Sequence, residues 1–261
     1  MRKIGSILIL LSLSLSLQAR CTSRGIWVKT LQDSLANGDL ILLVGYAHSI
    51  DILDSLGSRY PVYLQSGEQK VELEIVEYYK GQVSIASVYL RAKAPLKAGD
   101  YYEFHIDNLD PYHEYHLKER EKKGAEGQYK GWWIAKGRSL PVPVQMIPPV
   151  FSETIFLPLG CGPESFCKFI ADSSYRNRYE VKVELFNHNS QTSHISVIRI
   201  SLDNELWVGT NMCSGNFYFI KNHSYKIRFC LRNARGEESE WTEWMKAPNP
   251  NSSMETDSKK G

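Results

Sequence analysis

The chain has 261 residues, of which 43% are hydrophobic and 23% charged, which is the balance of an ordinary globular protein. A formal net charge of +2 is too small to indicate a nucleic-acid partner or an anionic membrane surface. Without an N-terminal leader, about 240 residues would form two domains of common size or one large domain.

The N-terminus has the order of a signal peptide. Met1-Arg2-Lys3 is followed by an apolar stretch from Ile7 to Leu17 and by the small residue Ala19. This stretch is shorter than the ~20 residues of a membrane-spanning helix, and no later segment is both long and free of charge. Residues 1–20 are therefore predicted to be a leader, and the protein is expected to be secreted, periplasmic or in the outer envelope.

Cys21 raises an alternative to simple release. The segment Leu17-Gln18-Ala19-Arg20-Cys21 partly resembles the lipobox of bacterial lipoproteins, but Arg20 stands where that motif has a small residue. Release is favoured, and lipidation of Cys21 is the only membrane contact that we expect.

Apolar and polar residues alternate repeatedly along the chain, which predicts half-buried β-strands. Turn residues such as Lys80-Gly81 and Arg235-Gly236 separate the runs. Leu40 to Val44 is apolar throughout and could be a strand covered on both faces, whereas residues 112–123 are predicted to be a solvated loop or short surface helix. The alternating apolar positions are Val71, Leu73 and Ile75; Tyr102, Phe104 and Ile106; Val181, Val183 and Leu185; Ile198, Ile200 and Leu202; and Tyr225, Ile227, Phe229 and Leu231.

Four prolines between Leu140 and Pro149 predict an extended connector, because proline removes ladder donors and stiffens the chain. The expected fold is all-β, with two tandem antiparallel β-sandwich domains after the signal peptide. The N-terminal domain would cover residues 21–147 and the C-terminal domain residues 148–248. The polar residues 249–261 are expected to be disordered.

The C-terminal segment resembles known modules. Tyr225 to Phe229, a turn at Asn233 to Glu237, and Ser239-Glu240-Trp241 resemble the last hairpin of fibronectin type III and immunoglobulin-like domains, which implies a β-sandwich. Ala94 to Tyr102 is similar to the approach to a strand in bacterial Ig-like surface modules. Both resemblances concern the fold and imply no ligand.

Trp241-Thr242-Glu243-Trp244 resembles the tryptophan box of cytokine receptors, with Met245 in place of the closing serine. Those receptors carry cysteine pairs in the first module and a membrane span after the second. This sequence shows neither feature.

The four cysteines of the C-terminal domain form an even set, and export permits disulfides. Four cysteines allow three pairings. A tight Gly162-Pro163 loop favours a bond between Cys161 and Cys167, which leaves Cys213 with Cys230. Structural disulfides are preferred to a metal site, because the spacing lacks close cysteine or histidine pairs.

His113-Glu114-Tyr115-His116, with Asp107 and Asp110 upstream, is the one metal-like cluster, and an exposed polar loop is the favoured interpretation. No metal or other cofactor is therefore expected. The sequence contains no nucleophile elbow, phosphate loop or nucleotide fingerprint. A non-catalytic protein is expected, with an exported hydrolase whose site is assembled in space as the alternative.

Trp132 and Trp133 are adjacent in an apolar segment, so in a strand one of them should face outward. An exposed indole near Tyr115 and Tyr129 could stack on a sugar or anchor a protein partner at the cell surface. Alternatively, a loop or the second domain covers that indole. The sequence thus predicts an exported binding or structural protein, with carbohydrate binding through tryptophan as one alternative.

Overall fold

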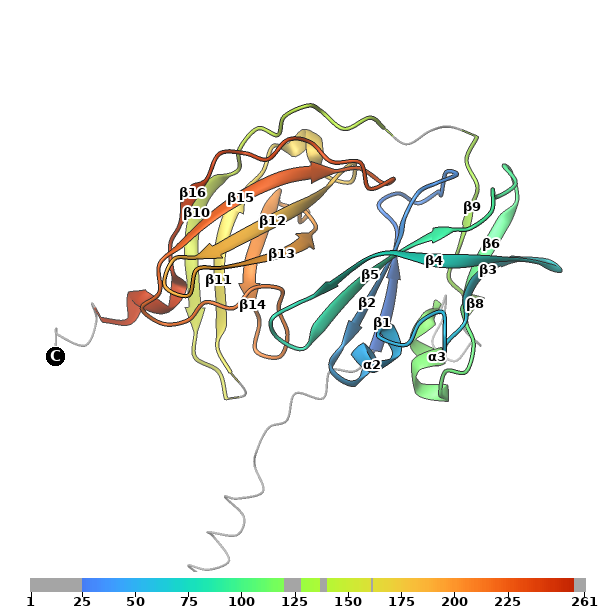
Figure 1. Cartoon of the computed structure of the whole chain (residues 1–261), viewed down its shortest axis with the longest axis horizontal. Coiled ribbons are helices and arrows are strands. Elements are labelled where there is room, and N and C mark those ends of the chain that lie inside the picture. Colours follow the sequence, from blue (N-terminus) through green and yellow to red (C-terminus); the bar gives the residue numbers. More distant parts are fainter. Residues whose placement is uncertain (1–24, 120–127, 137–139, 161, 256–261) are drawn as a thin grey trace, which may run out of the picture.

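A computed structural model describes residues 25–119, 128–136, 140–160 and 162–255. The predicted leader, Cys21 and Cys161 lie outside these residues. Nearly all regular structure is β, and every pair of neighbouring strands is antiparallel, which confirms the all-β prediction. Two groups of strands, an N-terminal and a C-terminal half, lie side by side (Figure 1).

The N-terminal half is built on a seven-stranded sheet with the order β1-β2-β5-β4-β3-β6-β9. Its longest strand, β4, pairs with β3 through its first residues and with β5 through its remainder. The elements are β1 (Gly25–Lys29), β2 (Ile41–Tyr46), η1 (Ala47–Ser49), α2 (Ile50–Leu53), β3 (Val62–Ser66), β4 (Gln69–Lys80), β5 (Ile85–Ala92), β6 (Tyr101–Ile106), α3 (Pro111–Leu117), β7 (Lys118–Glu119), β8 (Gln128–Tyr129) and β9 (Gly131–Trp133).

A bulge in β4 changes which face its side chains occupy. Val71 and Leu73 are buried in the N-terminal core, as the alternation predicts. The register then shifts between Ile75 and Glu77, and Ile75 is exposed. An extra residue in one strand moves later side chains to the other face. As a result, Tyr79 packs against a different hydrophobic cluster.

The C-terminal half has a three-stranded sheet, β10-β11-β14, and a four-stranded sheet, β13-β12-β15-β16. Apolar side chains of both sheets share one buried core, including Phe169 of the first and Val183 and Phe229 of the second. Burial of such side chains contributes roughly 1.5–3 kcal/mol each. The elements are β10 (Val150–Leu157), β11 (Glu164–Ile170), η2 (Ser173–Tyr175), β12 (Glu180–Asn187), β13 (Thr192–Ile198), β14 (Glu205–Thr210), β15 (Tyr225–Arg232), β16 (Met245–Ala247) and η3 (Pro250–Glu255).

A third apolar cluster joins the two halves. In β2, Ile41 and Leu43 point into the N-terminal core, whereas Leu42 and Val44 belong to a cluster that also contains Val197 of the C-terminal half. Successive strand residues face opposite sides, so a strand covered twice is apolar throughout. Leu40 to Val44 is therefore covered on both faces, as predicted.

Backbone hydrogen bonds also cross the junction. Leu40 N donates to Ala234 O at 2.7 Å. At the turn between β4 and β5, Val83 N donates to Gly215 O at 3.0 Å, and Gly215 N donates to Val83 O at 2.8 Å. The halves are thus tied by main-chain bonds as well as by apolar contact.

Arg232, at the end of β15, is fully buried in this junction. Its Nη2 donates to Glu77 Oε1 at 2.7 Å, and its Cζ lies 4.1 Å from the ring centroid of Tyr89. Tyr89 OH in turn donates to Glu180 Oε2 at 2.8 Å. Burial raises the pKa of Tyr89 well above its ordinary value, so the phenol remains a donor.

The structure corrects two expectations about the C-terminal half. The strand expected through Leu202 ends at Ile198, because residues 199–204 form a loop in which Leu202 is exposed. Part of the tail expected to be disordered forms η3, where Asn251 Oδ1 accepts a hydrogen bond of 2.9 Å from Ser165 Oγ. Residues 256–261 lie outside the description.

The connector at 140–149 contains no strand apart from an isolated bridge at Gln145. The division into domains near residue 148 remains a prediction, as does the signal peptide. Among the described residues, no helix has the length and apolar character needed to cross a membrane.

Candidate functional site

The two adjacent tryptophans of β9 separate as the strand geometry predicts. Trp132 is 3% exposed and lies in the N-terminal core, whereas Trp133 is 62% exposed. Trp133 lies against Tyr101 of β6, with ring centroids 5.3 Å apart and ring planes at 58°. Tyr101 is itself 38% exposed, so the two rings form an aromatic pair at the edge strand of the sheet.

The other predicted binding tyrosines are not seen to join this pair. Tyr115 is exposed on α3, and the side chain of Tyr129 lies outside the description. The sequence reasoning missed Tyr101. Strand alternation could have identified it, because Tyr102 and Phe104 face inward and their neighbour Tyr101 must face outward.

His113 is buried in the structure, which corrects the expectation of an exposed polar loop. His113 Nδ1 lies 2.8 Å from Asp110 Oδ1, and His113 Nε2 lies 3.0 Å from Ser49 Oγ. The pKa of the Asp110 carboxyl is below its ordinary value because the carboxylate accepts several hydrogen bonds. The hydrogen bond from the peptide N–H of His113 contributes most to this lowering. The ionised Asp110 therefore orients the imidazole through Nδ1.

The order Ser49, His113, Asp110 is that of a hydrolytic triad, but the serine is in the wrong environment. Ser49 is 0% exposed, and Gly25 N donates to its Oγ at 2.9 Å. A nucleophile must be accessible to its substrate, and the Ser49 hydroxyl is enclosed by other protein groups. The three residues instead have a structural role. Ser49 of η1 accepts a hydrogen bond from the first residue of β1 and contacts His113 of α3, so these three elements are held together.

The favoured cysteine pairing is wrong. Cys167 and Cys230 are both free and buried, so neither the bond of Cys167 with Cys161 nor that of Cys230 with Cys213 is present. Burial raises the pKa of each thiol to about 12. Cys213 is disulfide-bonded, and its partner lies outside the described residues. No group of three or more metal-ligating side chains occurs among the described residues.

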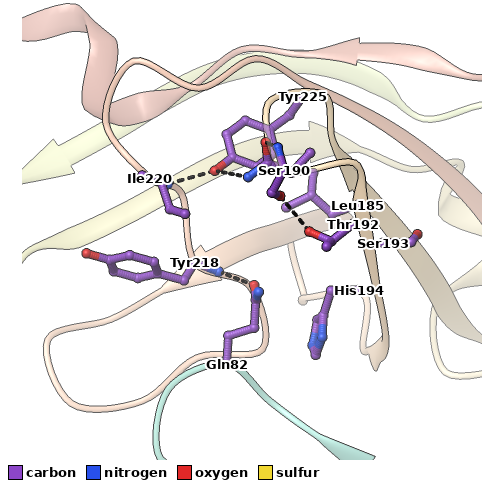
Figure 2. Close-up of a pocket in the computed structure, with 10 residues that line it drawn as sticks. Gln82, Leu185, Ser190, Thr192, Ser193, His194, Tyr218, Ile220 and Tyr225 are labelled. Atoms are coloured by element: carbon purple, nitrogen blue, oxygen red, sulfur yellow. Dashed lines mark hydrogen bonds between the residues drawn. The ribbon is translucent and has the colours of Figure 1, made fainter.

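A polar pocket of about 200 Å³ lies where the turn at Gln82 meets the hairpin between β12 and β13 (Figure 2). Tyr218 N donates to Gln82 Oε1 at 2.7 Å, which links the two halves. On the hairpin side, Ser190 Oγ and Thr192 Oγ1 are 2.7 Å apart. Burial lowers the pKa of His194, so this imidazole is neutral at pH 7.

The hydroxyl groups that line this pocket are already engaged in hydrogen bonds within the protein. The Ser190 and Thr192 hydroxyls are hydrogen-bonded to one another, and Ser193 Oγ donates a hydrogen bond to Glu184 Oε1. Its volume also lies below the roughly 300–1,000 Å³ of common small-molecule sites. We interpret it as the polar margin of the junction.

The Trp241 to Trp244 segment covers the outer face of the four-stranded sheet by interleaving rings and cations. Arg228 Cζ lies 4.7 Å from the Trp241 ring centroid and 4.6 Å from that of Trp244. Lys226 Nζ lies 4.4 Å from the Trp244 ring and 4.7 Å from the Phe186 ring. A cation over an aromatic face contributes roughly 0.5–1 kcal/mol at exposed sites.

A broad groove of about 1090 Å³ adjoins this stack. Its lining includes Trp244, Lys226 and Met245 and the imidazoles of His188 and His223. It combines apolar surface with basic and imidazole groups, but its residues do not form a catalytic arrangement.

No protein family matches the sequence, and no curated protein resembles it. The solved structures similar to the chain include a type I pullulanase from Bacillus subtilis str. 168 complexed with maltose, at 11% identity and a TM-score of 0.27. A pullulanase complexed with maltotriose from Anoxybacillus sp. LM18-11 matches at 10% identity and a TM-score of 0.25. These matches cover 88% and 86% of this chain, but only 25% of each pullulanase.

A cytokine receptor complex matches at 12% identity and a TM-score of 0.27, over 87% of this chain and 98% of that chain. Likenesses this distant carry no argument about function.

Proposed function

We propose that this chain is an exported, non-catalytic binding protein of two tandem Ig-like β-sandwich domains, which recognises a protein ligand through the aromatic pair Trp133 and Tyr101. The observation that carries this proposal is the 62% exposure of Trp133 on an edge strand. Exposed tryptophan and tyrosine are the residues that most often dominate the energy of a binding interface.

The rest of the molecule supports a binding role. The Ser49 hydroxyl of the triad-like group is buried, and the Figure 2 pocket is small and internally bonded. The two halves share an apolar cluster and main-chain bonds, so they can present one composite surface.

The C-terminal half supports the Ig-like part of the proposal. Sheets of three and four antiparallel strands around one core are the layers of a seven-stranded sandwich. A disulfide at Cys213 is consistent with an oxidising, exported location.

A protein ligand is favoured over a sugar because of the shape of the aromatic pair. The two rings meet at 58° and so form a wedge, whereas stacking on a sugar ring needs a flat face. Trp132, the other tryptophan considered for sugar binding, is buried. A wedge with a polar handle on each ring suits a pocket on a protein surface.

The test is a binding screen of the mature chain against a library of secreted and cell-surface proteins and against a glycan array. We expect a protein ligand whose affinity falls at least tenfold in Trp133→Ala, which corresponds to a hot-spot loss of about 1.4 kcal/mol or more. Trp207→Ala is the matched control, because Trp207 is a partly exposed tryptophan of the other half.

Equal loss in both variants, or no loss in Trp133→Ala, would contradict the assignment of this surface. Binding confined to glycans would replace the protein ligand by a carbohydrate. Turnover of ester, peptide or glycoside substrates that Ser49→Ala abolishes would support the hydrolase alternative instead.

A further inference from the structure

The groove of about 1090 Å³ lies at an open edge of the four-stranded sheet. Its lining includes all of β16, from Met245 to Ala247, and Thr154 of β10 in the other sheet. Among the residues that the structure describes, β16 pairs with β15 and with no other strand, so one of its edges is free to accept another strand. The groove is larger than the roughly 300–1,000 Å³ of common small-molecule sites, which favours an extended chain as its occupant.

The side chains of β16 divide between two faces of the sheet. Ala247 is buried in the sandwich core and Met245 packs against that core, so Lys246 between them points to the outer face. There it stands directly opposite Lys226 of β15. Like charges opposite one another destabilise a sheet, and a carboxylate on a neighbouring strand would relieve this repulsion.

The groove carries positive charge without a balancing carboxylate in its lining. Lys226 and Lys246 both belong to the lining, and none of the lining residues is acidic. Within the described part of the chain, neither lysine forms an ion pair. Glu184, the carboxylate on the strand next to β15, is already paired with Arg228. The groove therefore favours a ligand with negative charge.

Part of the lining is fixed by hydrogen bonds. Asn249 Nδ2 donates to His223 O at 2.9 Å and to Ile220 O at 2.8 Å. The His223 ring is also held, because Asn187 contacts its Nδ1. Groups that are in place before a ligand arrives lose less conformational entropy on binding.

Trp244 belongs to the lining but does not offer a free ring face to a sugar. Arg228 Cζ and Lys226 Nζ lie over this ring, at 4.6 Å and 4.4 Å from its centroid. The ring is thus already engaged with cations. This arrangement favours a peptide over a carbohydrate.

We propose that an extended segment of a partner protein, with alternating acidic and apolar residues, binds in this groove by adding a strand to β16. Main-chain hydrogen bonds to the free edge supply affinity, and side chains supply specificity. The acidic residues of the added strand lie beside Lys246, and the apolar ones lie beside Met245 and Ala247. The groove shares no residue with the Trp133 surface, so this proposal and the proposed function can fail independently.

The test is the binding of labelled synthetic peptides to the full chain, measured by fluorescence anisotropy. The main probe has about eight residues, within the usual length of a strand, and alternates glutamate with valine. We expect saturable binding that weakens as sodium chloride is added. A peptide with lysine in place of glutamate should bind at least about tenfold more weakly, because it meets like charge. A fully N-methylated version keeps the side chains and removes every main-chain donor, so it should not bind.

Two substitutions then locate the site. Lys246→Glu changes an exposed side chain and replaces attraction by repulsion, so the affinity for the glutamate peptide should fall about tenfold. Lys221→Glu is the matched control, because Lys221 is also exposed in the C-terminal half but does not line the groove. This variant should bind the peptide as wild type does.

Equal affinity of wild type and Lys246→Glu would overturn the proposal. Equal binding of the N-methylated peptide would do so too, because it would show attraction by charge alone. Binding of an acidic polysaccharide such as polygalacturonate, without binding of any peptide, would show a glycan site instead. Self-association of Lys246→Val without peptide binding would show that this lysine only keeps the free edge from pairing with another copy.

Discussion

The outer face of β15 is covered in different ways at its two ends. At one end, Arg228 lies between the rings of Trp241 and Trp244, and Lys226 lies between those of Trp244 and Phe186. Both cations remain partly in contact with water. At the other end, Arg232 lies on the same face but is fully buried over Tyr89 at the junction. Aromatic rings that pack over Arg228 leave its guanidinium partly solvated, whereas packing against the N-terminal half removes that of Arg232 from water.

This difference predicts unequal energies, because desolvation makes a charged group dependent on its partners. Cys230 lies between the two arginines on the same face, and its thiol is free and buried. Substitutions of Arg232 and Cys230 on β15, and of Trp241 in the segment that covers it, can therefore separate the two kinds of cover.

The largest effect is expected at Arg232. Arg232→Ala removes the ion pair with Glu77 and the contact with Tyr89, and it leaves a cavity at the junction. We expect the free energy of unfolding, measured in urea, to fall by about 3 kcal/mol. Arg232→Met keeps most of the volume and should lose less. A loss below about 0.5 kcal/mol in Arg232→Ala would show that the junction does not depend on this residue.

A smaller effect is expected at the aromatic cover. Trp241→Ala removes a half-buried ring from Arg228 and Lys182, and should lower the free energy of unfolding by about 1–2 kcal/mol. A double-mutant cycle of Trp241→Ala with Arg228→Met should give a coupling of about 0.5–1 kcal/mol. Zero coupling would mean that the ring stabilises the sheet by burial alone.

The smallest effect is a pH dependence. Because burial raises the pKa of Cys230 to about 12, the folded thiol keeps its proton where the unfolded thiol, with its ordinary pKa near 9.0, loses it. Stability is therefore independent of this group below pH 9 and falls as the pH rises toward 12. At pH 9.5 the expected loss is about 0.8 kcal/mol.

Cys230→Ala should not show this loss of stability at high pH. The difference between the stability profiles of wild type and Cys230→Ala against pH therefore reports the contribution of the Cys230 thiol. Parallel profiles between pH 8 and 10 would contradict the assignment. Cys167, also buried and free, serves as an internal comparison, because it lies in the sandwich core on the other sheet.

Local alternation accounts for what could be predicted from the sequence. Period-two patterns identified β4, β6, β12 and β15, and strand alternation predicted that one of Trp132 and Trp133 faces outward, without indicating which. The apolar run at Leu40 to Val44 indicated a doubly covered strand, although it did not show that the second cover is the other half of the chain.

Features that depend on distant pairing could not be predicted in this way. Ser49 and His113 are 64 residues apart, and no local pattern brings them together. The proposed Cys161–Cys167 pairing rested on a tight loop. Cys167, however, alternates with Phe169, and both point into the sandwich core, so the strand pattern itself argued against that pairing.

The bulge in β4 has a mechanical consequence. Its first residues hydrogen-bond to β3 and its later residues to β5, and beyond the bulge Tyr79 reaches the junction with the C-terminal half. The backbone of β4 thus connects the β3-β6-β9 part of the sheet, whose edge strand bears Trp133, to the junction with the other half. A force applied to a ligand at β9 would cross the hydrogen bonds that join β9, β6, β3 and β4 before it passed along β4 to the junction. These strand pairs should therefore bear the force together with the junction.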